Sequence, residues 1–318
     1  MLTYIVRRLF QLIVVIFGVT IITFVIMFLI PGDPARMLAG KSPTPGKIAM
    51  IRSELAIDRP LYVQYTRFVN RLAHGDFGTS YQTDRPVSAM LKENIPYTAQ
   101  LALAAVLLEL IGIPLGIYSA LRQYTFWDSA YTTTALIVWG IPVFVMGLFL
   151  QWTFGLKLNL LPVTGAGDLA FGIFPNSWNS FLHLILPAIA IGLVEVAYIS
   201  YMQRAAMLEV IRSDYIRTAR AKGLSERQVV FKHAFKNAVI PVMTIAGIDL
   251  GALMGGAIIT EAVFSRPGVG QMIYSSIGAR DLPVVAAGVI FSTFVYVIAN
   301  LIVDLSYAWV DPRIRLEE

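Results

Sequence analysis

The stretch around which the chain is organised reads Asp214-Tyr-Ile-Arg-Thr-Ala-Arg-Ala-Lys-Gly-Leu-Ser-Glu-Arg-Gln228 and continues through Phe231-Lys-His-Ala-Phe-Lys-Asn-Ala-Val-Ile to Pro241. It is a long polar segment between two apolar runs, each long enough to cross a membrane. The residues up to Lys222 favour a helix. Gly223 is well placed to end it, because glycine readily adopts the left-handed conformation found after helix C-termini.

A second short helix is predicted after this glycine. Ser225 and Gln228 have the spacing of a capping box, which starts a helix that we expect to reach about Lys236. Such a basic segment fits a solvated loop near anionic lipid. The small residues Ala219, Ala221 and Gly223 instead favour close docking against another protein. The helix, turn and helix carry six basic residues, namely Arg217, Arg220, Lys222, Arg227, Lys232 and Lys236.

This segment resembles the cytoplasmic signature loop of ABC-importer permeases, most closely the form found in dipeptide and oligopeptide permeases. Arg217 and Thr218 stand where the general motif has Glu-Ala. Further stretches that support the resemblance are Pro31-Gly-Asp-Pro34, Leu161-Pro-Val-Thr-Gly165, Phe264-Ser-Arg-Pro-Gly-Val-Gly270 with Arg280-Asp-Leu-Pro283, and Asp311-Pro-Arg-Ile-Arg315. The loop residues that the resemblance implies contact an ATPase are Tyr215, Arg217, Thr218, Ala219, Ala221, Lys222, Gly223, Leu224 and Ser225.

The resemblance implies an all-α membrane protein with six transmembrane helices, the type I ABC importer permease fold. It implies a second, homologous permease subunit, two cytoplasmic ATPase subunits and an extracytoplasmic substrate-binding protein that delivers short peptides. Permeases of this branch also serve nickel chelates and glutathione, so those substrates stay open. A rival hypothesis is a proton-coupled secondary transporter, although the sequence has no visible internal repeat of the kind such transporters carry.

Composition also favours a membrane protein. Hydrophobic residues make up 57% of the 318 residues and charged residues only 14%, against about 25% charged in soluble domains. The net charge of +5 does not indicate nucleic-acid binding, because many basic residues lie in loops that flank apolar runs. The chain has no cysteine, and its three histidines are widely scattered, so we expect no metal site.

Six apolar runs divide the chain. The first follows Arg7-Arg8 and is too long for a signal peptide, so residues 1–31 are expected to form an uncleaved transmembrane helix. Residues 32–97 are expected to form a small, partly helical extracytoplasmic lobe, and 98–310 a five-helix core that includes a coupling loop at 205–237. The five later runs cover about 98–121, 130–154 (broken at Gly140-Ile-Pro142), 183–202, 238–263 and 284–310.

The basic residues of the loops predict the orientation. Basic side chains gather on one side of the runs, so the positive-inside rule places the N-terminus in the cytoplasm. Six crossings then place the 311–318 tail there too. By resemblance, we expect a multi-pass protein of the bacterial inner membrane.

Glycines and carboxylates within the runs are the other candidate sites. Gly247, Gly251 and Gly255 recur every four residues and form a small-residue ridge that favours close helix packing. Asp249 lies on the opposite face of that helix, and a membrane carboxylate either lines an aqueous pathway or pairs with a neighbour. Glu195 and Glu109 pose the same alternatives, with structural pairing favoured.

The sequence shows no catalytic centre. Gly40-Lys41-Ser42 imitates the end of a phosphate loop, but Ala35 stands where the first glycine would be. We therefore predict no catalytic residue, no cofactor and no enzymatic activity of this chain, with ATP hydrolysis in partner subunits.

Overall fold

The computed structural model describes residues 2–29, 35, 44–55, 58–168, 172 and 174–310. These residues form helices and loops, with a single isolated bridge between Thr79 and Pro86. The Pro31–Pro34 and Asp311–Arg315 motifs and the Gly40-Lys41-Ser42 segment lie outside the described residues. The elements are α1 (Leu2–Leu29), α3 (Pro45–Leu55), α4 (Leu61–Ala73), α5 (Val87–Glu109), α6 (Gly112–Leu121), α7 (Phe126–Trp139), α8 (Val143–Leu150), the π-helical η1 (Gln151–Lys157), α9 (Trp178–Ile211), α10 (Asp214–Ala221), α11 (Glu226–Gln228), the π-helical η2 (Val229–Ala234), α12 (Phe235–Ala238), α13 (Ile240–Met254), α14 (Ile258–Val263), α15 (Val269–Ala279) and α16 (Leu282–Val310).

Each of the six apolar runs corresponds to a helix or a bent helix pair. Three spans of the described chain are long and apolar enough to cross a membrane: α5 with α6, α9, and α16 up to Val303. Two further candidates are bent pairs, α7 with α8 and η1 at 97°, and the α11–α12 segment with α13 at 48°. The first apolar run corresponds to α1, in which Phe10–Ile26 is a shorter apolar stretch that falls below the length of these spans. The all-helical membrane architecture predicted from the sequence is confirmed.

The helix boundaries differ from the apolar runs where tertiary contacts extend or interrupt a helix. The second helix begins at Val87 rather than near residue 98, because Val87 and Leu91 are buried against α15 and α16. The fifth run was predicted to be continuous to Val263, but it breaks after Met254. Gly256 there has φ +122°, and a Cβ on it would lie 2.9 Å from the backbone nitrogen of Gly270.

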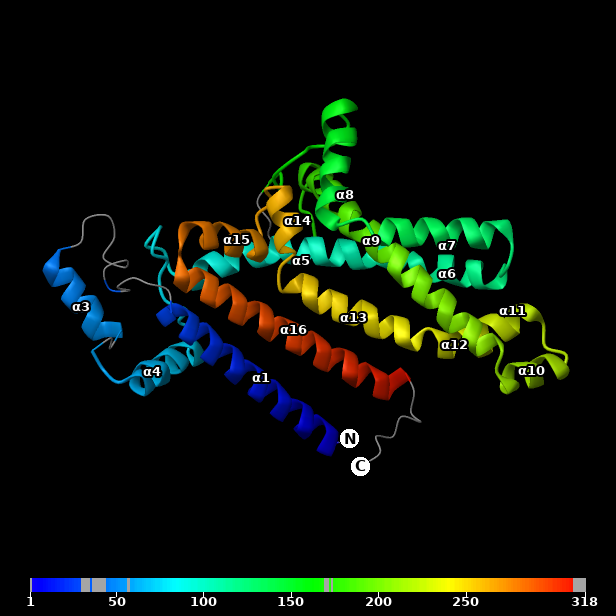
Figure 1. Cartoon of the computed structure of the whole chain (residues 1–318), viewed down its shortest axis with the longest axis horizontal. Helices are drawn as coiled ribbons and strands as arrows, with labels where there is room; N and C mark the ends of the chain where they lie inside the picture. The colour runs from blue at the N-terminus through cyan, green and yellow to red at the C-terminus, as the bar shows by residue number, and fades with distance from the viewer. Residues whose placement is uncertain are drawn as a thin grey trace.

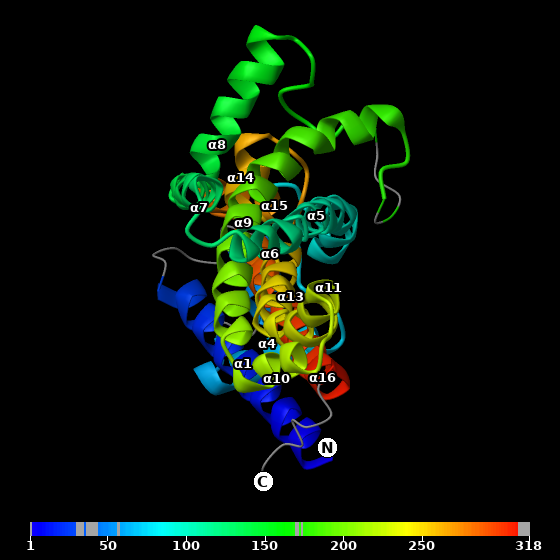
Figure 2. The same ribbon diagram turned by 90° about the vertical axis from the view of Figure 1, so that its right-hand side faces the viewer.

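Helix α9 is the centre of the bundle. It packs against α5, α6, α7, α8 and α13, and Figures 1 and 2 show it running obliquely through the middle of the molecule. Small residues allow the close approach: a Cβ on Gly112 of α6 would lie 2.7 Å from the carbonyl oxygen of Val196. A Cβ on Gly192 would lie 2.8 Å from the Cβ of Leu108. The α6 backbone therefore approaches the α9 backbone directly at Gly112, and the Leu108 side chain of α5 packs against the α9 backbone at Gly192.

Helix α1 lies along the edge of the bundle. It packs side by side with α16, and the two run in opposite directions (Figure 1). Its second half also contacts α4, where the Tyr65 ring meets Phe17 and Phe24 edge-on at centroid distances of 6.0 and 5.4 Å. The Thr20 and Tyr65 hydroxyl oxygens lie 2.9 Å apart in a hydrogen bond. Part of the polar region after α1 is thus fastened to α1 itself.

The glycine ridge of α13 faces α16 of the same chain. A Cβ on Gly251 would lie 2.6 Å from the Cβ of Ala299, and one on Gly255 would lie 3.2 Å from the Cβ of Ser292. A Cβ on Gly247 would likewise lie against the side chain of Val303 in α16. Whether the ridge meets its own subunit or another was open from the sequence, and in this structure it meets its own.

Candidate functional site

The signature segment forms the predicted helix, turn and helix. Helix α10 ends at Ala221, and Gly223 follows with φ +79°, the left-handed conformation expected of a glycine after a helix. Ser225 begins the next helix through a capping box with Gln228, whose Oε1 accepts the Ser225 backbone N–H at 3.3 Å. The second helical stretch runs through α11, η2 and α12 to Ala238. The helix end and the capping box are confirmed.

A buried apolar base holds this segment on the bundle. Ile216 and Ala219 of α10 pack with Met207 at the end of α9 and with Ile117 of α6. The second stretch contributes to the same cluster, whose remaining buried members are Ala120, Val229, Val230, Ala234 and Ala238. Ile216 and Met207 are completely buried. Burial of so many apolar side chains couples the segment firmly to α6 and α9.

The tip of the segment, residues 220–228, is exposed throughout. Arg220 spans the turn to Glu226, with Nε to Oε1 at 2.7 Å and Nη2 to Oε2 at 3.3 Å. Asn237 Nδ2 donates to the Tyr215 hydroxyl at 2.7 Å and ties the two helical stretches together. A Cβ on Gly223 would meet nothing within 4 Å, so no part of the described chain fills the space around the turn.

The structure separates the nine predicted contact residues into two groups. Ala219 is 6% exposed and belongs to the buried base rather than to the surface. The other eight are exposed: Tyr215, Arg217, Thr218, Ala221, Lys222, Gly223, Leu224 and Ser225. The segment is therefore anchored by its buried base and has an exposed tip that carries Lys222, Gly223 and Leu224.

Three membrane carboxylates come together inside the bundle. Glu109 lies on α5, Glu195 on α9 and Asp249 on α13, and these three helices pack against one another. The charge of Asp249 acts on both glutamates, which places the three groups within electrostatic reach. Glu109 is fully buried, and in the part of the chain that the structure describes neither of its carboxylate oxygens has a hydrogen-bond partner. The described residues thus show no pairing partner for Glu109, and the choice between pathway lining and structural pairing stays a prediction.

Sequence reasoning missed a buried ion pair at the α7–α9 crossing. Arg204 contacts Asp128 through two bonds, from Nε to Oδ1 at 2.7 Å and from Nη2 to Oδ2 at 2.8 Å. The Ser119 hydroxyl donates to Asp128 Oδ1 at 2.6 Å, and the Tyr124 backbone N–H donates to Oδ2 at 3.1 Å. Asp128 is 4% exposed. The two residues are 76 positions apart in the chain, so no local pattern in the sequence indicates that they pair.

A second polar cluster lies between α5 and the Phe264–Gly270 motif. Glu261 accepts hydrogen bonds from the Thr98 hydroxyl and the Gln271 backbone N–H, both at 2.8 Å. Arg266 is completely buried and donates from Nη2 to Gln100 Oε1 at 3.1 Å. Burial lowers the pKa of Arg266 to about 10, and the charge of Glu261 opposes that change. The motif thus fastens the turn before α15 to α5.

Asp281 of the Arg280–Pro283 motif makes a third anchor. Its Oδ2 accepts the Ser80 hydroxyl at 2.5 Å, and its Oδ1 accepts the Tyr81 backbone N–H at 2.9 Å. Burial raises the pKa of Tyr81 to about 12, and the charge of Asp281 adds to the effect. This carboxylate holds the 78–86 turn against the start of α16.

Comparison with known proteins covers both halves of the chain. Residues 112–316 match the family described as binding-protein-dependent transport system inner membrane component, and residues 1–102 match the N-terminal family of the same systems. The dipeptide transport system permease protein DppB of Alkalihalophilus pseudofirmus is 41% identical over 99% of this chain and 100% of its own length. DppB of Escherichia coli is 36% identical over 99% of each chain.

Two further similarities are informative. The glutathione transport system permease protein GsiC of Salmonella paratyphi A is 37% identical over 99% of each chain. A chain of the solved MetNI methionine ABC transporter superposes with a TM-score of 0.56 at 17% identity, over 70% of this chain and 97% of its own. At that identity the structural likeness bears on the fold alone.

Proposed function

This chain belongs to the family of binding-protein-dependent transport system inner membrane components, and on that premise we propose that it is the permease subunit of an ATP-driven importer of short peptides. The observation that carries the proposal is end-to-end similarity at 41% identity to a dipeptide permease, covering 99% of this chain. The chain is a multi-pass protein of the inner membrane, which works with ATPase and substrate-binding components. Peptides are the favoured substrate, and glutathione is the alternative with a similar relative.

Coupling to ATP hydrolysis is assigned to the exposed tip at residues 220–228. Residues 220–225 of the tip lie outside the candidate spans, and the buried base of the segment connects the tip to α6 and α9. An ATPase subunit that holds the tip can therefore move two membrane helices as one body. We assign two ATPase subunits to the complex, one for each of two permeases. ATP binding closes the ATPase pair and opens the pathway outward, and hydrolysis reverses the change.

The pathway is assigned to the face where α5, α9 and α13 meet. Asp249 and Glu195 lie there, with Glu109 buried beside them. Carboxylates within a membrane bundle are costly and generally face the protein interior or a water-filled cavity. Carboxyl oxygens can accept hydrogen bonds from the amino terminus and the backbone N–H groups of a peptide.

A second permease is proposed to cover the arm made of α8 and η1. This arm leaves the direction of α7 at 97° and carries exposed apolar side chains, including Leu148, Phe149 and Trp152. The chain has no native cysteine, so a single Leu148→Cys substitution gives an unambiguous cross-linking site. A cross-link to the second permease supports the assignment, and labelling by a lipid-soluble probe alone refutes it.

The orientation is proposed as cytoplasmic at both ends. The start of α1, the end of α16 and α10 lie toward one side of the molecule, and α3 and α15 toward the other (Figure 1). A reporter that is active only in the cytoplasm is expected to work after Arg122 or Leu224 and to be silent after Gly268. A signal from the Gly268 fusion would overturn this orientation.

Uptake of a labelled dipeptide tests the proposed function. The chain and its partners are expressed in a host that lacks peptide permeases, and unlabelled dipeptide, glutathione and a nickel chelate are added as competitors. Competition by dipeptide alone is expected. Transport that stops with a proton uncoupler while ATP is held constant would favour the secondary-transporter alternative.

A further inference from the structure

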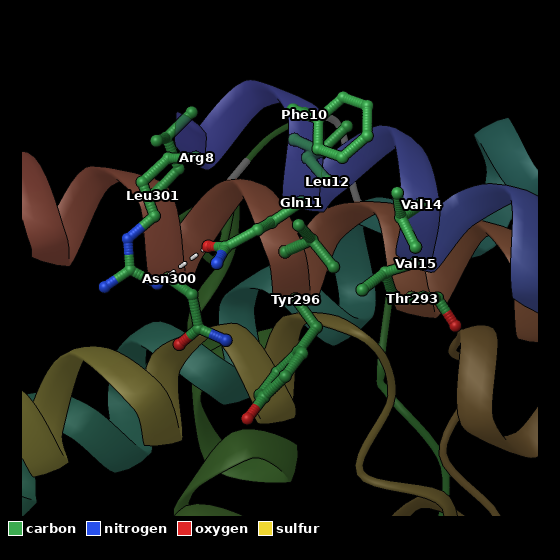
Figure 3. Close-up of a pocket in the computed structure, with 11 residues that line it drawn as sticks. Arg8, Phe10, Gln11, Leu12, Val14, Val15, Thr293, Tyr296, Asn300 and Leu301 are labelled. Atoms are coloured by element: carbon green, nitrogen blue, oxygen red, sulfur yellow. Dashed lines mark hydrogen bonds between the residues drawn. The ribbon is translucent and has the colours of Figure 1, made fainter. Parts of the chain in front are cut away.

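A groove runs between α1 and α16 on the edge of the bundle, with a volume of about 710 Å³. Figure 3 shows its two ends: Val14, Val15 and Thr293 lie at one, and Arg8, Asn300 and Leu301 at the other. Phe10, Val14 and Val15 belong to the apolar part of α1, and more than two fifths of each is exposed. One end of the groove is therefore lined mainly by hydrocarbon.

The other end is polar and basic. Arg8 Nη1 donates to Gln11 Oε1 at 3.5 Å. This hydrogen bond uses the oxygen of the Gln11 side-chain amide and not its NH₂ group. Asn300 of α16 brings a second amide to the same end (Figure 3). Arg7 adds a neighbouring positive charge just before the apolar part of α1. The groove thus passes from a cluster of N–H donors into an apolar part near the residue where the apolar stretch of α1 begins.

We propose that this groove binds one anionic phospholipid, with the phosphate at Arg8, Gln11 and Asn300 and an acyl chain between α1 and α16. The groove changes from basic to apolar along its length, as a phospholipid changes from its phosphate to its hydrocarbon chain. Basic pockets between transmembrane helices are a recognised form of site for anionic headgroups. The bound lipid fills the seam between the edge helix α1 and the rest of the permease.

The change in polarity along the groove favours a lipid over an apolar helix from a partner subunit. Along α1 the groove extends from Arg8 to Val15, about 10 Å at 1.5 Å per residue. Over that length it passes from basic and amide side chains to apolar ones, as a phospholipid passes from its headgroup to its acyl chain. A partner helix is the other occupant, and the variants below distinguish the two.

Native mass spectrometry of the detergent-purified complex tests the proposal. The complex is incubated with phosphatidylglycerol or with phosphatidylcholine, and retained lipid is counted per permease. Arg8→Gln is expected to lower retention of phosphatidylglycerol about fivefold, the loss of one basic group near an anionic headgroup. It should lower retention of phosphatidylcholine less, because the choline cation offsets the charge of the phosphate. Val15→Trp fills the apolar end while it keeps the charge, and is expected to lower retention of both lipids.

The matched control is Arg122→Gln, which removes an exposed charge at the end of α6, where the guanidinium lies 5.2 Å from the centre of the Tyr118 ring. This variant should retain both lipids as the wild type does. Wild-type retention of phosphatidylglycerol in Arg8→Gln overturns the proposal, whether or not the melting temperature falls. If Val15→Trp keeps its lipid but loses the second permease on purification, a protein covers the groove and the proposal is wrong. Should Val15→Trp fail to insert, Arg8→Gln alone decides.

Discussion

Replacement of Gly223 is expected to disconnect ATP hydrolysis from transport without disturbing the membrane helices. Gly223 has φ +79°, and a non-glycine residue reaches that region at a cost of about 1–2 kcal/mol. One or two kcal/mol changes an equilibrium by a factor of about 5–30. In Gly223→Leu, the population of the observed turn relative to other conformations of the segment should fall by that factor. Since a Cβ would meet nothing of the described chain within 4 Å, we expect a greater loss to come from contact with a partner.

Two control variants separate the causes. Gly223→Asn places a side chain of similar size on the turn, but asparagine visits the left-handed region more readily than leucine. It should therefore keep more coupling than Gly223→Leu if backbone geometry is decisive. Arg227→Ala removes one exposed charge of the same tip and should have little effect.

The assay is stimulation of ATP hydrolysis by the loaded binding protein in reconstituted vesicles, with peptide uptake measured in parallel. Gly223→Leu should insert and co-purify through its intact spans, yet lose both stimulation and uptake. Full stimulation and uptake in this variant would refute the assignment of the coupling contact to the 220–228 tip. Equal loss in the asparagine and leucine variants would show that the partner's cleft excludes any side chain.

Three further variants test the fold and the pathway. Gly251→Leu should overpack the contact between α13 and α16, at a typical cost of about 1–3 kcal/mol, and so lower the melting temperature of the solubilised protein. The control Gly278→Leu has open space around its Cβ and should leave the melting temperature unchanged. Asp128→Asn leaves the Arg204 guanidinium without its buried partner and should cost about 3–5 kcal/mol, so an unchanged melting temperature would contradict the role given to this pair. Asp249→Asn should retain ATP-dependent uptake that is indifferent to an uncoupler, and complete loss of uptake would show that the charge itself is required.

The features that could be predicted from the sequence obey local rules. The left-handed Gly223 and the capping box of Ser225 depend on neighbours within three residues, and both were found as expected. The number and order of the apolar runs depend on composition over about 20 residues, which hydropathy captures. The break near Gly140-Ile-Pro142 also follows locally, because proline cannot continue the helix ladder.

What could not be predicted depends on residues far apart in the chain. Helix α5 begins at Val87 because α15 and α16, nearly 200 positions later, bury its first turns. The residues after Val87 are mixed in polarity, so a hydropathy reading assigns them to the lobe. The same reading ends the fifth run at Val263, since nothing local reveals that the backbone of Gly270 approaches Gly256.

Charged residues show most clearly what could not be predicted from the sequence. Hydropathy assigns Arg266 to a solvated outer loop, yet the side chain is completely buried and donates to Gln100. A buried guanidinium requires nearby compensation, and here Glu261 and the ring of Tyr97, 5.8 Å from the Arg266 Cζ, supply it. Glu261 in turn accepts hydrogen bonds from the Thr98 hydroxyl and from the backbone N–H of Gln271 in α15. An apolar residue at position 266 would remove the Gln100 contact and leave the Glu261 charge buried without a cation beside it. Arg266 therefore joins α5 to the Phe264–Gly270 motif as part of a network, and its role can be argued only once the two segments are seen together.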